Sequence, residues 1–202
     1  LGLEVSGEIV ALGGEQTQWS IGDRVCALTN GGGYAEYVAV NARHCLPIPD
    51  GVNEQDAAGL PETYFTVWSN IFFNQKIKNG SIFLVHGGSG GIGSTAIQIG
   101  AAMGLQVFTT ASSAESCAYC EGLGAKRTIN FNEEDFVPIL REIGGANIIL
   151  DIMGGDYVAR NIKAAHADAK IIQLAFNLGS KIEVDLMPVM LKRLTLTGST
   201  LR

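Results

Sequence analysis

A glycine-rich turn between an apolar segment and a helix-like segment constrains this chain more than any other feature. The apolar run Ile82–Val85 is too short for a helix, and the turn His86–Gly93 follows it directly. Within this turn, Gly88, Gly90 and Gly93 have the G-x-G-x-x-G spacing of turns that bind the pyrophosphate of a dinucleotide. The motif is informative here because it lies between a predicted strand and a predicted helix.

Each glycine of this spacing has a separate physical role. Gly88 is expected to permit the tight turn, Gly90 to let the backbone approach a pyrophosphate, and Gly93 to let the helix pack close to the strand. The helix N-terminus offers free N–H groups and a positive dipole to the phosphates. The predicted cofactor-binding residues of the turn are Gly88, Ser89, Gly90, Gly91, Ile92 and Gly93.

The chain beyond residue 60 alternates between short apolar runs and helix-like stretches. This alternation predicts an α/β fold with a mostly parallel, doubly wound sheet, right-handed crossovers and strand order 3-2-1-4-5-6. The predicted strands are Ile82–Val85, Gln106–Thr110, Arg127–Asn130, Asn147–Asp151, Lys170–Ala175 and Leu194–Thr197. The predicted helices are 93–103, 113–123, 133–143, 156–166 and 187–192.

Residues 1–57 have a different pattern, in which short strands alternate with turns. Strands are predicted at Glu8–Leu12, Asp23–Leu28 and Tyr34–Val40, the last because apolar and polar residues alternate. So few residues are marginal for an independent domain, and we expect part of a larger β-rich domain. The chain opens on Leu1 and closes on a strand-like stretch, so we expect an internal fragment of a longer protein.

Composition excludes several classes of function. The 202 residues are 47% hydrophobic and 17% charged, enough to bury a core. The net charge of −6 argues against a nucleic-acid partner. No apolar run reaches the ~20 residues that a membrane helix needs, and no secretory leader is recognisable. We therefore expect no membrane association.

The cysteines and histidines do not form a metal-binding pattern. Cys117 and Cys120 make a single C-x-x-C, whereas a structural zinc site usually needs two such pairs. We interpret them as two residues of one helix, one of them buried. Cys26 and Cys45 show no disulfide pattern, so a cytoplasmic location is expected.

The end of the second predicted strand of the parallel sheet bears on the choice of dinucleotide. An NAD site usually has an acidic residue there to accept from the ribose 2′-OH. This strand instead ends in Ala111, Ser112 and Ser113. Since nothing there repels a 2′-phosphate and Ser112 and Ser113 can donate to it, the tip favours NADP. Glu115 lies further on, in the predicted helix.

The carboxyl ends of the fourth and fifth strands would border the same crevice, at the switch point of the sheet. Asp151 could be an acid there, but we interpret it as a cap for the following helix, and His86 as a hydrogen-bonded residue at a strand end. The residues expected to line the crevice are Met153, Gly154, Ala175 and Phe176, together with Tyr64 and Thr66 from before the sheet.

Several motifs, in order along the chain, resemble the medium-chain dehydrogenase/reductase superfamily. In the first part they are Gly2–Gly7, Gly22–Val25 and Gly32–Tyr37. The resemblance to its zeta-crystallin-like quinone oxidoreductases is carried by Pro61–Trp68, the glycine turn, Leu150–Gly155 and Leu194–Ser199.

This resemblance implies part of a GroES-like catalytic domain over residues 1–60 and a Rossmann domain over residues 61–202. It implies NADPH-dependent hydride transfer to a quinone without metal, usually by a homodimer, with Tyr64 at the substrate. The zinc-dependent branch has a histidine ligand where Leu3 stands here. No nucleophile–base pair identifies a catalytic residue.

Two positions depart from the family pattern. Ser116 stands where relatives have a lysine that binds the 2′-phosphate, and Phe131 replaces a tyrosine near the adenosine end of the cofactor. The predicted preference for NADPH over NADH is therefore modest.

Two other functions remain open from the sequence. One is NADPH-dependent reduction of the double bond of an enal or enoyl thioester. The other is a non-enzymatic, crystallin-like role in which NADPH is bound without turnover.

Overall fold

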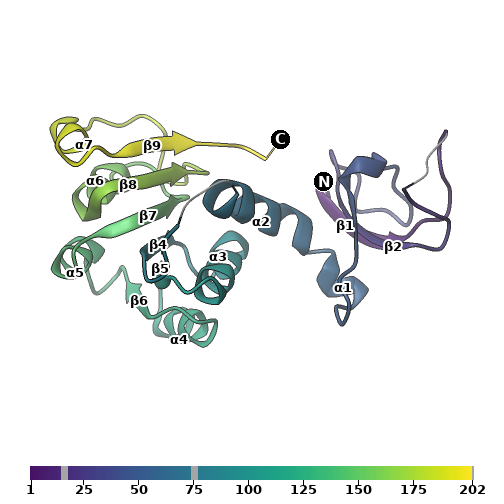
Figure 1. Cartoon of the computed structure of the whole chain (residues 1–202), viewed down its shortest axis with the longest axis horizontal. Coiled ribbons are helices and arrows are strands. Elements are labelled where there is room, and N and C mark those ends of the chain that lie inside the picture. Colours follow the sequence, from purple (N-terminus) through teal and green to yellow (C-terminus); the bar gives the residue numbers. More distant parts are fainter. Residues whose placement is uncertain (15–17, 74–76, 202) are drawn as a thin grey trace. The chain divides into compact units, whose positions relative to one another are not determined.

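The computed structural model describes residues 1–14, 18–73 and 77–201, and it divides the chain into two compact units. The first unit is Leu1–Thr66 and the second is Val67–Arg202. Each unit has its own sheet (Figure 1).

The first unit contains a small antiparallel sheet. Strand β2 lies in the centre, between β1 and β3. The inward residues Val25, Ala27 and Cys45 form a small core, and the Trp19 indole beside it donates to the Ala42 carbonyl at 3.0 Å. The elements of this unit are β1 (Glu4–Glu8), β2 (Arg24–Leu28), a 3₁₀ turn (Ala42–His44), β3 (Cys45–Pro47), α1 (Glu54–Ala57) and α2 (Leu60–Val67), whose last residue belongs to the second unit.

Two strand predictions in this unit are wrong. A strand is expected at Glu8–Leu12, but the observed strand β1 covers Glu4–Glu8. It ends at Glu8 because that residue pairs with Arg24, the first residue of β2. The segment Tyr34–Val40 forms no strand, although its residues alternate. Tyr34 and Tyr37 are 84% and 74% exposed, because no described strand pairs with this segment. Strand β3 and helices α1 and α2 were not predicted.

The second unit is built on a six-stranded parallel sheet. Its order is β6-β5-β4-β7-β8-β9, which is the predicted 3-2-1-4-5-6 arrangement. The doubly wound parallel fold is therefore confirmed. The strands are β4 (Ile82–His86), β5 (Gln106–Ala111), β6 (Arg127–Asn130), β7 (Ala146–Asp151), β8 (Ala165–Gln173) and β9 (Thr195–Gly198).

Helices cover both faces of this sheet. The predicted helices are present within a few residues of their expected ends, and a π-helical segment at Trp68–Phe72 precedes the sheet. Strand β8 starts at Ala165, earlier than predicted, and ends at Gln173 rather than Ala175. Its residues 166–168 are exposed and lack the apolar run by which a buried strand is recognised. The helices are α3 (Gly91–Ala102), α4 (Ala114–Gly122), α5 (Phe136–Glu142), α6 (Tyr157–Ala164) and α7 (Met187–Lys192).

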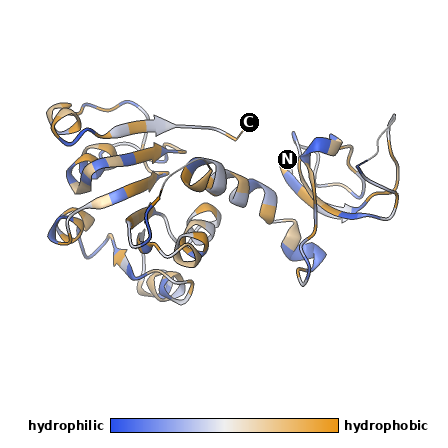
Figure 2. Cartoon of the chain, viewed as in Figure 1, coloured by the Kyte–Doolittle hydropathy of each residue, from blue (hydrophilic) through white to orange (hydrophobic). Residues whose placement is uncertain are grey.

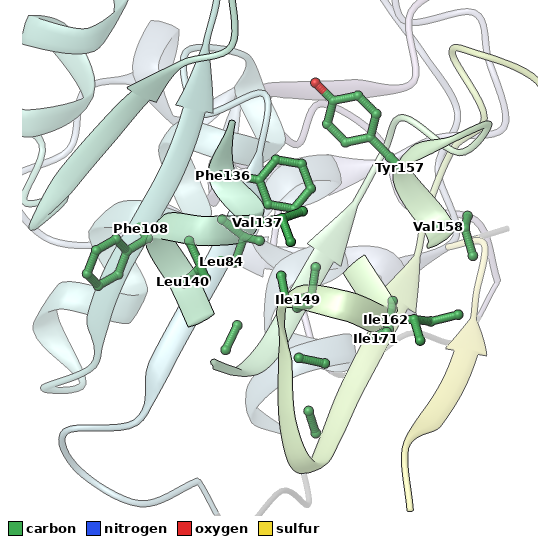
Figure 3. Close-up of a cluster of buried hydrophobic side chains, with 14 of the residues drawn as sticks. Leu84, Phe108, Phe136, Val137, Leu140, Ile149, Tyr157, Val158, Ile162 and Ile171 are labelled. Atoms are coloured by element: carbon green, nitrogen blue, oxygen red, sulfur yellow. The ribbon is translucent and has the colours of Figure 1, made fainter. Parts of the chain in front are cut away.

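Alternate residues of each central strand pack against different helices, which explains the continuous apolar runs. Leu84 of β4 belongs to a buried cluster that also contains residues of α5 and α6, such as Phe136 and Ile162 (Figure 3). Its neighbours Phe83 and Val85 pack on the opposite face, with residues of α3. Figure 2 shows hydrophobic residues in the strands and in the helices beside them.

The cysteine prediction is confirmed in the described chain. Cys117 and Cys120 both lie on α4, and only Cys120 is fully buried. All four cysteines are free thiols. No helix among the described residues is long and apolar enough to cross a bilayer.

Candidate functional site

The glycine turn joins β4 to α3, and two of its glycines are required by close approach. A Cβ on Gly93 would lie 2.2 Å from the Gly87 carbonyl oxygen, so only glycine lets the helix approach the strand this closely. A Cβ on Gly88 would lie 2.1 Å from Thr109 Oγ1, on the adjacent strand β5. The predicted role of Gly93 is thus supported by geometry.

The left-handed position of the turn is Gly87, not Gly88. Gly87 has φ of +73°, whereas Gly88 is needed for packing against β5. Gly90 is the N-cap of α3 and is exposed, and a Cβ there would meet only the Gly87 carbonyl oxygen, at 3.5 Å. The surface over Gly90 is therefore open to an approaching phosphate, beside the unpaired first N–H groups of the helix.

The end of β5 presents a second set of polar groups. Ser112 and Ser113 are exposed, and Ser113 caps α4 by accepting from the Ser116 amide at 3.1 Å. The Ser113 and Ser116 hydroxyls are also 3.1 Å apart. Glu115 lies in the first turn of α4, as expected. This tip combines hydroxyl groups with a helix N-terminus, a combination that suits an anion.

The segment after β6 contains Phe131, which the sequence predicts near the adenosine end of the cofactor, and Asn132, which it does not. The Asn132 side-chain amide donates to the Ser112 carbonyl at 2.8 Å, and the Phe131 amide donates to the Ala111 carbonyl at 3.0 Å. Both bonds hold this segment against the end of β5. Phe131 itself is 38% exposed. The bonds are not readable from sequence, since they depend on the pairing of β5 with β6.

The same segment brings negative charge close to α4. Burial, followed by the carboxylates of Glu121, Glu133 and Glu134, raises the pKa of the Cys117 thiol. Glu134 is paired with Arg127 at 2.6 Å. The sequence has no acid at Ala111–Ser113, but the segment that follows β6 brings Glu133 and Glu134 close to α4. The sequence signal was the acidic run after Asn132.

The ends of β7 and β8 form a third part of the site. Leu178 donates from its amide to the Met153 carbonyl at 2.7 Å, and Gly155 donates to the Gly179 carbonyl at 2.8 Å. Gly154 has φ of +66°, and a Cβ there would lie 2.7 Å from the Gly179 carbonyl oxygen. The turn after β7 is thus bound tightly to the segment after β8, which includes the half-exposed Phe176.

A buried polar network lies beneath these turns. His86 is 1% exposed and bonds to Thr110 Oγ1 at 3.1 Å and to Asn161 Oδ1 at 2.7 Å. The interpretation of His86 as a hydrogen-bonded residue is confirmed. Burial lowers the pKa of His86 to about 4, so the ring is neutral at physiological pH.

Asp151 is fully buried, and its carboxylate serves the turn after β7. One oxygen accepts from the amides of Met153, at 2.6 Å, and Gly154, at 3.1 Å. The other accepts from Asn161 Nδ2 at 2.8 Å. The expectation that Asp151 caps the following helix is wrong, because its carboxylate binds the amides of the turn after β7, whereas the N-cap position of α6 is Asp156. Burial raises the pKa of Asp151.

The parallel sheet places the ends of β4, β5, β7 and β8 at one edge, and the switch point lies between β4 and β7. Most predicted cofactor residues lie there. Tyr64 and Thr66 are on α2 in the first unit, where the Thr66 hydroxyl donates to the Glu62 carbonyl at 2.6 Å. Their contact with a cofactor or substrate stays a prediction.

The described residues offer no metal site. Nowhere in residues 1–14, 18–73 and 77–201 do three His, Cys, Asp or Glu side chains gather as metal ligands would.

Comparison with known proteins places the two units in one family. Residues 91–202 match the family model "Zinc-binding dehydrogenase", and residues 1–50 match "Alcohol dehydrogenase GroES-like domain". A quinone oxidoreductase of Mus musculus is 28% identical over 206 residues, which is 99% of this chain and 62% of the relative. The chain thus spans less than two thirds of that relative's length.

Solved structures agree with this comparison. A quinone oxidoreductase of Pseudomonas syringae aligns with a TM-score of 0.87 at 27% identity, covering 100% of this chain and 63% of that one. A quinone oxidoreductase of Escherichia coli, solved in complex with NADPH, aligns with a TM-score of 0.88 at 25% identity, covering 98% and 63%. From these matches and the two sheets, the chain belongs to the medium-chain dehydrogenase/reductase superfamily, and to the family described as zinc-binding dehydrogenases.

Proposed function

We propose that the intact protein is an NADPH-dependent oxidoreductase that transfers a hydride to a quinone. The observation that carries the proposal is the glycine turn at the switch point of the sheet, where Gly93 approaches Gly87 and Gly90 stays open. Support for the acceptor comes from the relatives named as quinone oxidoreductases, one of them solved with NADPH.

The chain's own residues fit this cofactor in three places. The turn over Gly90 and the first N–H groups of α3 would bind the pyrophosphate. Ser112, Ser113 and the N-terminus of α4 would receive the 2′-phosphate. The turn with Met153 and Gly154, beside Ala175 and Phe176, would hold the nicotinamide ring. When bound, the cofactor supplies the hydride, and the protein supplies position and a site that excludes water.

The residues do not fit the zinc that the family's name implies. Leu3 precedes Glu4 where the zinc-dependent branch has a histidine, and no described cluster could replace that ligand.

The experiment that tests the function uses the full-length protein. NADPH oxidation is measured against a quinone panel and, in parallel, against enals and enoyl thioesters. Turnover with quinones supports the proposal. Turnover with enals or enoyl thioesters alone identifies a double-bond reductase, and NADPH binding without any turnover identifies a crystallin-like binding protein.

We also propose that the intact protein is a homodimer formed through the edge of the sheet. Strand β9 is the last strand in the sheet order, so one side of its backbone has no partner strand among the described residues. Unpaired edges favour pairing with another chain. Helix α7, just before β9, exposes Met187, Met190 and Leu191 by more than 60% each.

A further inference from the structure

Two of the turns proposed to bind the cofactor are joined by one continuous chain of buried hydrogen bonds. The Gly87 amide donates to Thr110 Oγ1 at 3.3 Å, and that oxygen lies 3.1 Å from His86 Nδ1. His86 Nε2 is 2.7 Å from Asn161 Oδ1, and Asn161 Nδ2 donates to Asp151. Asp151 then accepts from the amides of the Met153–Gly154 turn.

The chemistry of the groups gives this chain a single direction. Asn161 Oδ1 can only accept, so His86 Nε2 carries the proton and Nδ1 accepts from the Thr110 hydroxyl. The Asn161 amide group then donates to the Asp151 carboxylate. A residue at position 161 must therefore accept on one side and donate on the other.

We propose that Asn161 is a positioning residue for the cofactor, because it orients Asp151 and so fixes the Met153–Gly154 turn. Asn161 lies on α6 and is fully buried, and its side chain bonds to His86, where the glycine turn begins, and to Asp151. Its side chain reaches from the end of β4 to the end of β7, the two strands that flank the switch point. The inference rests on the proposed function only for the identity of the ligand.

Loss of Asn161 would remove the 2.8 Å bond to one oxygen of the buried Asp151 carboxylate, and the carboxylate would then rotate toward the remaining side-chain donor, Gln173. That rotation releases the Met153 and Gly154 amides. The turn would loosen locally, whereas the glycine turn, held also by its own close packing, would keep its shape. The half of the dinucleotide that carries the nicotinamide would lose its site, and the adenosine half would not.

The test compares Asn161→Leu with the control Asn147→Leu. Asn147 also makes a side-chain bond in the sheet, accepting from the Ile82 amide at 2.8 Å, but at the opposite end of the strands. The measurements are amide hydrogen exchange without cofactor, and binding of NADPH and of the half-molecule 2′,5′-ADP. All binding is measured at a temperature where both variants are folded by circular dichroism.

In Asn161→Leu we expect tenfold or faster exchange at Met153 and Gly154, at least tenfold weaker NADPH binding, and 2′,5′-ADP binding within threefold of the unmodified protein. In Asn147→Leu the exchange rates at Met153 and Gly154 and the binding of both nucleotides should stay within threefold of the unmodified protein. Unchanged exchange at Met153 and Gly154 in Asn161→Leu would overturn the positioning role. Failure of the unmodified protein to bind either nucleotide would overturn the proposed function instead, and the exchange measurement would still decide the role of Asn161.

Discussion

The carbonyl oxygen of Gly87 occupies the space that a side chain on Gly93 would need, 2.2 Å from its Cβ position. This contact sets the distance between the end of β4 and the first turn of α3. The surface of the turn that we propose for the pyrophosphate thus depends on a helix that packs closer than any residue other than glycine allows.

Gly93→Ala is expected to destabilise the protein by about 2 kcal/mol net, because inserting a methyl group into a fully packed site costs about 3 kcal/mol. The higher helix propensity of alanine, worth about 1 kcal/mol, offsets part of the steric cost. Urea unfolding of both proteins measures the difference. A variant as stable as the unmodified protein would contradict the geometry of the turn.

Gly90→Val is expected to leave stability within about 1 kcal/mol, because Gly90 has extended φ and ψ and its Cβ position is open. The added side chain instead covers the surface proposed for the pyrophosphate. NADPH binding should fall at least a hundredfold by fluorescence titration. Gly13→Val, at another open glycine, controls for the exposed apolar group. Undiminished binding would remove Gly90 from the site.

Stability should fall in acid because of His86. Its folded pKa of about 4 lies below the ordinary value of 6.5, so the unfolded chain binds a proton that the folded protein refuses. The contribution of His86 to the free energy of unfolding is complete above pH 6.5. It is lost as the pH falls from 6.5 to 4, and the loss levels off below pH 4. The total is about 3 kcal/mol, at 1.36 kcal/mol per unit.

His86→Gln removes this titration and provides the comparison. The free energy of unfolding is measured at intervals between pH 4 and 7.5. The difference between the two proteins should change across this window, while the opposing effect of Asp151 is common to both. A difference that stays constant with pH would show that His86 titrates normally in the folded state.

The parallel sheet and its order were predictable because each strand is a short apolar run between glycines or helix-like stretches. The network under the site was not. Asn161 is 75 positions from His86 and 10 positions from Asp151 in the sequence. The Asn161 side chain lies between the other two only because helix α6 crosses back over the sheet. The strand prediction for Tyr34–Val40 is wrong because alternating apolar and polar residues indicate a strand only where one face is buried. No strand among the described residues pairs with this segment to bury that face.

Assembly can be tested at the β9 edge. We expect sedimentation of the full-length protein at micromolar concentration to show a dimer. Met190→Glu adds a buried charge if α7 belongs to the interface, and it should shift the protein to monomer without unfolding it. Ser180→Glu, on an exposed loop, is the control. A protein that is monomeric before any substitution would contradict the homodimer.

The choice between NADPH and NADH depends on opposing charges at the β5 tip. Ser112, Ser113 and the N-terminus of α4 favour a 2′-phosphate, whereas Glu133 and the other nearby acids disfavour it. Ser116 lacks the charge of the lysine found in relatives. We therefore expect NADPH to bind only about tenfold more tightly than NADH, equivalent to about 1.4 kcal/mol.

Ser116→Lys would add a charge-assisted contact of about 1 kcal/mol, reduced from the buried value by solvent. It should tighten NADPH about fivefold and leave NADH unchanged. The Ser113 cap persists, since it accepts from the backbone of residue 116. Ala118→Lys, two residues along the same helix and so on another face, controls for net charge. The gain should shrink as salt rises. Dissociation constants for both cofactors at low and high salt decide the matter, and tighter binding of NADH by the unmodified protein would show that the acids after β6 outweigh the serines.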